Sequence, residues 1–522
     1  MPETSQKQQQ PNILFVMADQ LSALALPPYG HRVVKAPQLS ALADSGAVFD
    51  NAYCNFPLCA PSRFSMLSGQ LASAIGAYDN AAELPSSVPT FAHYLRARGY
   101  RTVLSGKMHF VGADQLHGFE ERLTTDIYPA DFGWTPDWAQ EPTHYSWSQH
   151  MASVVEAGPC RRSLQIDFDE DATYQAQRRL YDLARDDDER PFFMTVSLTH
   201  PHDPYNCLPE HWSLYDDADI DEPAVAPMAP DAMEPHSRRL YYQASMHRFR
   251  LTPERIRNAR HAYYGMISYV DDLVGRLLRA LEASGLRENT VIVFTADHGD
   301  MLGERGLWYK MTFFEWSARV PLIVHWPKQW APRRVAPAVS LLDLLPTFLA
   351  LSGDREGRDA LMPPAGQSLL PWLEGESPQA RDVAAEYLGE GALDPRLMLR
   401  RGNLKFVFSE ADGRELYDLA EDPHERVNRA GHPDYVGEER ALYEALMARW
   451  DPVRLKSEVM ASQRHRLFIH DALTRGRYTP WDYQPRWDAS RAYVRNLGVD
   501  EDELKARSRL PRVEPVPADF ED

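Results

Sequence analysis

The sequence predicts an α/β protein with a mostly parallel central sheet between helices, followed by a smaller α+β domain and an extended C-terminal arm. Short runs that are apolar throughout alternate with helical patterns, as is typical of parallel strands buried on both faces. The length of 522 residues exceeds what one hydrophobic core usually serves, about 250–300 residues. After Gly353 the alternation stops, and short strands with turns take its place.

The first 355 residues contain the alternating pattern. Four apolar runs predict buried strands, at residues 12–18, 100–105, 192–198 and 290–296. Three amphipathic patterns predict helices, at residues 37–43, 90–98 and 253–283. Thr252 is the expected N-cap of the long third helix, and Pro253 lies in its first turn.

We expect three parts in the chain: a catalytic domain over 10–355, an α+β domain over 356–456 and an arm over 457–522. The second part is predicted from short strands and one helix, at residues 383–387, 397–400, 405–409 and 438–450. The last part is too rich in aromatic residues for a disordered tail. It is expected to be an extended arm that wraps its own body or a neighbour.

Composition narrows the class of partner. A formal net charge of −19 disfavours binding to nucleic acid and to anionic membranes. The four cysteines are too few and too scattered for a disulfide framework. The first ten residues are polar, which predicts no signal peptide, and no apolar run approaches the about 18 residues that a membrane span needs. A cytoplasmic location is expected.

The sharpest chemical signal is Cys-Ala-Pro-Ser-Arg at 59–63, followed by Leu-Ser-Gly at 67–69. Pro61 and Ser62 predict a helix start, which would place Cys59 beside free backbone N–H groups and lower the pKa of its thiol. A lone cysteine here would more often be structural, as we expect for Cys54. The whole string resembles the signature of formylglycine-dependent sulfatases, members of the alkaline-phosphatase-like superfamily. In that family a formylglycine-generating enzyme oxidises the cysteine, and the hydrated aldehyde becomes the nucleophile.

A metal site is implied by the same resemblance. Asp19 and Gln20 follow the strand at 12–18, and Asp297 and His298 follow the strand at 290–296. Ligands of such sheets bind at the carboxyl ends of the strands, where these residues could meet. The family implies that all four, with the modified Cys59, hold one divalent cation. Carboxylates favour Ca²⁺, with Mg²⁺ as an alternative, and the imidazole leaves Mn²⁺ open.

Gln20 departs from many sulfatases, which carry aspartate there. It matches the choline-sulfatase and phosphonate-monoester-hydrolase branches, and its expected role is a weaker ligand or an orienting group. The further catalytic residues that the resemblance implies are Arg63, Lys107, His109, His202 and Lys310.

Each of these residues has an expected role. Arg63, Lys107 and Lys310 would neutralise the sulfate group. Lys107 and His109 would share one face if their segment is extended. His202 would protonate the leaving alcohol, and His109 would deprotonate the second hydroxyl, so that the covalent sulfo-enzyme intermediate collapses and releases sulfate.

The arm contains three strings, at residues 480–485, 488–490 and 493–496, which together with residues 153–160 resemble the choline-sulfatase branch. The resemblance implies choline sulfate as the substrate and a homo-oligomer, a dimer of dimers, in which the arm reaches a partner subunit. A quaternary ammonium group has no N–H to donate, so aromatic faces and a carboxylate must hold it. The expected pocket residues are Trp134, His150, Glu386 and an acidic residue near Asp500.

Three alternatives remain open. A phosphonate monoester or phosphodiester hydrolase would share the cysteine motif and Gln20, and an arylsulfatase would share the whole site. A non-catalytic anion-binding protein with this fold would be expected to have lost one of the site residues, and none is lost.

Overall fold

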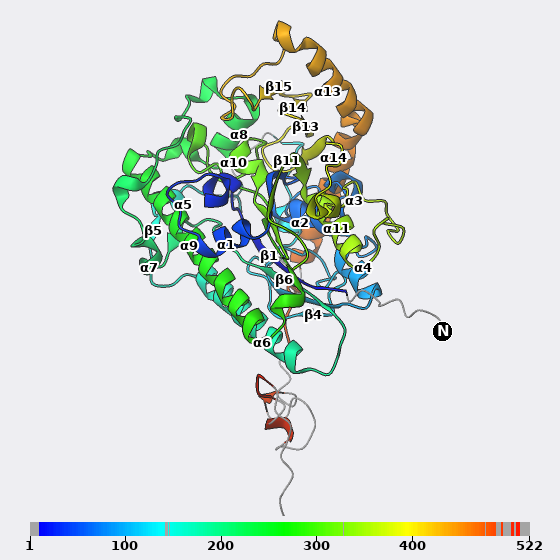
Figure 1. The fold of residues 1–522 in the computed structure, drawn as a ribbon. Helices are drawn as coiled ribbons and strands as arrows, with labels where there is room; N and C mark the ends of the chain where they lie inside the picture. The colour runs from blue at the N-terminus through cyan, green and yellow to red at the C-terminus, as the bar shows by residue number, and fades with distance from the viewer. Residues whose placement is uncertain are drawn as a thin grey trace, which may run out of the picture.

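The computed structural model describes residues 10–140, 145, 147–326, 328–475, 477–486, 492–493, 503–505 and 508–511. Its centre is a nine-stranded sheet in the order β11-β2-β10-β8-β1-β6-β3-β4, with β9 paired to β2 (Figure 1). The strands are β1 Asn12–Ala18, β2 Ala47–Tyr53, β3 Arg101–Gly106, β4 Glu121–Arg122, β6 Phe192–Ser197, β8 Thr290–Ala296, β9 Arg319–Val320, β10 Leu322–His325 and β11 Arg333–Ser340.

The central strands run parallel, as predicted. β1 pairs in parallel with β6 and β8, and β3 pairs in parallel with β6 and β4. β10 is antiparallel to both of its neighbours, so the sheet is mixed but mostly parallel. The register sets Ala18 of β1 opposite Ala296 of β8, which brings the residues that follow both strands to one edge of the sheet.

Helices cover both faces of the sheet (Figure 1). One layer contains α1 Pro37–Asp44, α6 Leu164–Arg185 and α9 Pro253–Ala283, and the other contains α2 Cys59–Ser68, α4 Phe91–Ala97 and α11 Leu344–Leu351. The α9 bounds and its Thr252 cap match the prediction, and the Thr252 side chain accepts a hydrogen bond from the Arg255 amide. Buried aromatic rings fill the space between the sheet and the second layer, at Phe15, Phe91, Phe193 and Phe348.

A four-stranded antiparallel sheet forms the smaller unit at the top of Figure 1. Its strands are β12 Val383–Tyr387, β13 Arg396–Arg401, β14 Leu404–Ser409 and β15 Gly413–Asp418, and α13 Val436–Arg449 packs against it. The three predicted strands are present. The fourth, β15, follows β14 through a tight turn at 410–412 and completes the sheet.

The extended arm expected from residue 457 is wrong for its first part, because α14 Pro452–Thr474 is helical. The buried residues of α14 lie on one stripe, but that stripe is apolar only at its start and becomes polar at Gln463 and Arg466. Because polar residues interrupt the buried stripe, the sequence lacks the apolar periodicity that would have predicted this helix. Residues 477–486 then follow an irregular path.

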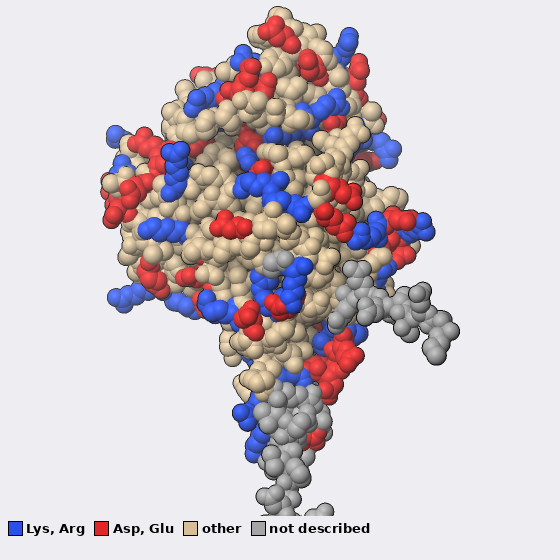
Figure 2. Space-filling view, viewed as in Figure 1, with Lys and Arg blue, Asp and Glu red and all other residues tan. Residues whose placement is uncertain are grey.

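The remaining short elements are α3 Ala72–Ile75, α5 Ala152–Val155, α7 Pro209–Trp212, α8 Pro235–Gln243, α10 Glu315–Ala318, α12 Leu370–Glu374, β5 Gly158–Pro159 and β7 Asn206–Cys207. In the described part of the chain, no helix combines the length and the apolar character needed to cross a bilayer. On the face drawn in Figure 2, acidic and basic side chains are interspersed.

Candidate active site

The candidate site lies at the carboxyl ends of β1 and β8. Asp19 follows β1, Asp297 and His298 follow β8, and Cys59 is the first residue of α2. One donor atom from each of these four side chains lies within 4.8 Å of the others, and all four side chains are buried. The structure therefore brings together residues that are more than 230 positions apart in the sequence, as the topology predicted.

The orientation of His298 fits a metal ligand. Its Nδ1 lies 3.0 Å from the Gly299 carbonyl oxygen, which can only accept, so Nδ1 carries the proton. The lone pair of Nε2 then faces the group, 3.2 Å from Cys59 Sγ and 3.7 Å from Asp19 Oδ1. Two carboxylates and a neutral imidazole with its second nitrogen hydrogen-bonded form a donor set that suits a divalent cation.

Arg63, which was expected to help neutralise the sulfate charge, is hydrogen-bonded mainly to the protein. Its guanidinium donates to Asp297 Oδ2 at 2.8 Å, Asp19 Oδ2 at 3.0 Å, Ser197 Oγ at 2.9 Å and the Lys107 carbonyl at 2.7 Å. Four of its five N–H groups therefore donate to the protein, and the side chain is fully buried. Arg63 therefore orients the two carboxylates and compensates their charge.

Lys107 and His109 lie in the irregular segment that follows β3. Lys107 forms an ion pair with Asp19 and lies 4.6 Å from the centre of the Tyr128 ring. His109 has a φ of 62°, so the segment is not the extended one expected, and the Asp126 carboxylate accepts its amide at 2.7 Å. Burial, and then the Lys107 charge, lower the pKa of His109 to about 3. Its ring nitrogens have no hydrogen-bond partner among the described residues, which leaves a neutral base.

Lys310 links His202 and Gln20. The ammonium group donates to Gln20 Oε1 at 2.6 Å and to His202 Nε2 at 2.8 Å. His202 Nδ1 donates to the Asp203 carbonyl at 2.7 Å, so Nε2 is the acceptor. Burial and the Lys310 charge hold the pKa of His202 well below its usual range. The Gln20 amide also donates to Asp300 at 2.6 Å, so this side chain orients Lys310.

The backbone around Lys310 is unusual. Tyr309 and Met311 on either side have φ angles of 67° and 76°, a region that residues other than glycine rarely occupy. Hydrogen bonds hold both: the Asp300 carboxylate accepts the Tyr309 amide at 3.1 Å, and His236 Nε2 donates to the Met311 carbonyl at 2.8 Å. Sequence reasoning missed His236, and no motif around it could have revealed the contact.

The thiol of Cys59 contradicts one prediction. Burial, and next the negative charge of Asp19, raise its pKa to about 11, whereas the start of a helix was expected to lower it. Complete desolvation therefore outweighs the partial charge of the helix. An unmodified Cys59 is a neutral thiol at neutral pH and a poor nucleophile.

The expected pocket residues are not all at the site. Trp134 ends a short helical turn, Phe132–Trp134, and its ring lies edge-on to His109 with 5.6 Å between centroids. His150 is exposed, and its main-chain carbonyl accepts from Tyr309 at 2.9 Å. A small cavity of about 20 Å³ is lined by Lys310 and by Ser148, Trp308 and Met246, and neither Trp134 nor His150 is among its lining residues. Asp500 lies outside the described residues.

Glu386 does not serve as the expected free carboxylate. It is fully buried on β12 and accepts hydrogen bonds from Ser73 Oγ at 2.7 Å and from Trp450 Nε1 at 2.9 Å. Glu390, four residues later, is the better candidate. Its side chain is also buried, and Oε2 has no hydrogen-bond partner in the described part of the chain. Burial raises its pKa to about 7, while the positive charge of Lys310 acts against this rise.

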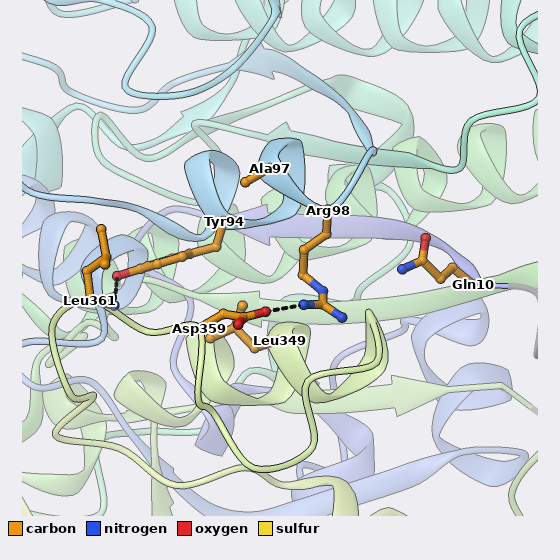
Figure 3. A pocket seen from close by; sticks show the side chains of 7 residues that line it. All are labelled: Gln10, Tyr94, Ala97, Arg98, Leu349, Asp359 and Leu361. Atoms are coloured by element: carbon orange, nitrogen blue, oxygen red, sulfur yellow. Dashed lines mark hydrogen bonds and ion pairs between the residues drawn. The ribbon is translucent and has the colours of Figure 1, made fainter.

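A larger cavity, of about 400 Å³, lies elsewhere and does not contain the chemistry (Figure 3). It lies beside Gln10, at the amino end of β1, whereas the candidate site lies at the carboxyl end. Its one cation, Arg98, pairs with Asp359 and donates to the Ser352 carbonyl. The Cys59 group is therefore the candidate active site of the two places.

Comparison with known proteins agrees with this geometry. Residues 11–353 match the sulfatase family, residues 303–450 match the C-terminal part of N-sulphoglucosamine sulphohydrolase, and residues 457–510 match the choline sulfatase C-terminal family. A choline-sulfatase of Rhizobium meliloti (strain 1021) is 43% identical over 97% of this chain and 99% of its own length. Arylsulfatase K of Rattus norvegicus is 28% identical over 82% of this chain and 77% of its own length.

A solved structure shows the same fold. The phosphonate monoester hydrolase of Agrobacterium radiobacter superposes with a TM-score of 0.67 at 24% identity, over 86% of this chain and 96% of that one. The sulfatase match covers the sheet and all four residues of the Cys59 group. The chain belongs to the sulfatase family.

Proposed function

We propose that this protein hydrolyses choline sulfate to choline and sulfate, after Cys59 has been converted to formylglycine. The observation that carries the proposal is the buried group of Asp19, Cys59, Asp297 and His298, with the charge of Lys310 close enough to act on Cys59. The 43% identity to a choline-sulfatase over nearly the whole chain supports the substrate.

The metal would be held by Asp19, Asp297, His298 and the oxygen that replaces sulfur at position 59, with Gln20 as a neighbour. Ca²⁺ is the favoured ion because oxygen donors dominate. When bound, such a cation polarises the sulfate oxygens and offsets the negative charge of the transition state.

The residues of the chain would divide the remaining work. One hydroxyl of the hydrated aldehyde at position 59 would lose its proton to solvent and attack sulfur, so that a new O–S bond forms as the bond from sulfur to the choline oxygen breaks. The departing oxygen takes a proton from the Lys310–His202 pair. His109 would then accept the proton of the second hydroxyl, and the bond from the aldehyde carbon to the sulfated oxygen would break as the C=O bond re-forms, which releases sulfate.

The cation of the substrate needs a carboxylate and aromatic faces. Glu390 supplies an oxygen with no other partner among the described residues, and Trp134 supplies the ring nearest His109. We propose Glu390 in place of Glu386, because the Glu386 carboxylate already accepts hydrogen bonds from Ser73 and Trp450.

The test of the proposal is a comparison of three substrates. Sulfate release from choline sulfate should exceed, in kcat/KM, the turnover of 4-nitrophenyl sulfate and of a phosphonate monoester. Faster turnover of the phosphonate would favour the second candidate, a phosphonate monoester hydrolase, which Gln20 and the similarity in fold support. No turnover of any of the three by protein carrying formylglycine would contradict both.

Glu390→Gln should raise KM for choline sulfate about tenfold, equivalent to about 1.4 kcal/mol of binding, because the neutral amide no longer attracts the ammonium group. With 4-nitrophenyl sulfate, whose leaving group has no cation, KM should stay within twofold. Steady-state kinetics of both substrates measure the difference.

The pH dependence gives an independent readout. Because the pKa of Glu390 is about 7, its charged form increases between pH 6 and 8, and KM for choline sulfate should fall over that range. The profile should become flat in Glu390→Gln. Glu386→Gln is the matched control, since its buried structural contacts predict equal effects on both substrates; selective loss in this variant instead would reverse the assignment.

The proposed partners follow from the resemblance alone. They are a formylglycine-generating enzyme for Cys59 and further copies of this chain in a dimer of dimers. The oligomer, the cytoplasmic location and the domain limits remain predictions.

A further inference from the structure

The buried stripe of α14 ends in two polar side chains, Gln463 and Arg466. Burying an amide and a guanidinium is costly unless both are hydrogen-bonded. Pro452, Leu455 and Val459 form the earlier part of the same stripe and pack as ordinary apolar core. The polar end therefore requires its own explanation, which its partners supply.

Arg466 forms a two-pronged ion pair. Its guanidinium nitrogens lie 2.6 and 2.7 Å from the two oxygens of Asp79, and both residues are buried. The same guanidinium donates to Thr135 Oγ1 at 3.1 Å. Paired, planar contacts of this kind fix geometry as well as charge. Arg466 thus ties α14 to the residue that follows Trp134.

Gln463 continues the connection toward Glu390. Its Oε1 accepts the Trp138 amide at 3.0 Å. The indole Nε1 of Trp138 donates in turn to the carbonyl of Gly389 at 3.1 Å, and Gly389 directly precedes Glu390. One helix therefore contacts both sides of the proposed cation pocket, the segment 134–138 and the residue before Glu390.

Electrostatics also connects Arg466 to the proposed cation pocket, through Asp79 and Glu390. Asp79 is close enough to Glu390 for its charge to contribute to the raised pKa of that carboxyl. Arg466 compensates the Asp79 charge through two short hydrogen bonds. Glu390 Oε2 has no hydrogen-bond partner among the described residues, so this carboxylate is available to pair with a cationic group of a ligand.

The chain after α14 reinforces the same segment. Tyr478 hydrogen-bonds to Asp131, and the Trp481 ring packs edge-on against Phe132 with 4.9 Å between centroids. These contacts come from the same chain and lie on residues 131–132, directly before Trp134. The C-terminal segment thus supports the pocket wall along its length.

We propose that Gln463 and Arg466 are positioning residues that set the preference of the enzyme for a cationic leaving group, by holding Trp134 and Glu390 in the geometry that binds it. The inference rests on the proposed function, since it assigns the support of that pocket. Neither residue contacts the Cys59 group, so the sulfate chemistry itself should be independent of both.

The test compares the Gln463→Met and Arg466→Met variants with the wild-type enzyme, all carrying formylglycine, on choline sulfate and on 4-nitrophenyl sulfate. KM for choline sulfate should rise about tenfold in each variant, with kcat within about twofold, and both parameters for the aryl sulfate should stay within about twofold. Arg464→Met, on the exposed face of the same helix, removes the same charge and should change nothing. In Arg466→Lys the KM for choline sulfate should lie between the wild-type and Arg466→Met values, because lysine keeps the positive charge but cannot make the paired hydrogen bonds to Asp79.

The outcomes separate the possibilities. Equal losses on both substrates would show a merely structural role and overturn the inference, as would unchanged KM values in both variants. Arg466→Met leaves the buried Asp79 with the Ala81 amide but without its counter-charge; if this variant fails to fold, Gln463→Met, which loses one hydrogen bond, decides alone. If the wild-type enzyme shows no preference for choline sulfate, the proposed function is contradicted, and so is this inference.

Discussion

Replacing Cys59 with serine is expected to lower the steady-state rate of sulfate release by at least about 10³-fold while the fold is retained. Serine can attack sulfur once, but it has no second hydroxyl with which to expel sulfate. The protein should therefore accumulate one sulfo group per chain. Intact-mass spectrometry after incubation with substrate detects that adduct, and sulfate release measures the turnover.

Cys54→Ser is the matched control for this variant. Cys54 is also buried and lies five residues earlier, but it lacks the Pro-Ser-Arg that follows Cys59. It should keep most of the activity. Normal turnover in Cys59→Ser, or equal loss in both variants, would contradict the assignment of the nucleophile.

Asp297→Asn is expected to remove the bound cation and most of the activity. The loss should exceed the about 10–100-fold that follows removal of a residue hydrogen-bonded to a metal ligand, because this carboxylate is itself a candidate ligand. It also accepts hydrogen bonds from Arg63 Nε at 2.8 Å and from the backbone N–H of Gln20 at 3.0 Å, so its charge organises the group. Elemental analysis of the purified protein gives the metal content, and rate against Ca²⁺ concentration gives the apparent affinity.

Asp271→Asn controls for the loss of a buried carboxylate. Asp271 is buried on α9 and accepts the amides of Gln38 and Leu39 at the start of α1, away from the Cys59 group. This variant should keep its metal and its activity. Full metal content in Asp297→Asn would exclude that carboxylate as a ligand.

The sequence predicted the centre of the fold best. Residues 12–18 and 290–296 are apolar throughout, and they form β1 and β8 without a shift in bounds. The strands β10 and β11 were missed for physical reasons. β10 has only four residues, and β11 lies at the sheet edge, half exposed, with a register shift between Val335 and Ala338. Such strands depend on their neighbours more than on their own pattern.

The site divides in a similar way. Motifs predicted the residues that chemistry demands, such as Cys59 and Asp297. They could not predict which groups each would contact. Arg63 was expected to neutralise the sulfate charge, and four of its five N–H groups donate to the protein itself, among them to Asp297 and Asp19. Glu386 and Glu390 are both buried acids, and only their hydrogen-bond partners distinguish the structural one from the available one.

The burial of Cys59 also constrains when the enzyme can be activated. The residue is 2% exposed, lies in the first turn of α2 and is surrounded by buried side chains. A second protein cannot reach its thiol once the sheet and helices have packed. On the proposed function, oxidation must therefore precede folding, on the nascent or still unfolded chain. A molecule that folds unmodified stays inactive until it is unfolded again, so the yield of active enzyme is decided during synthesis.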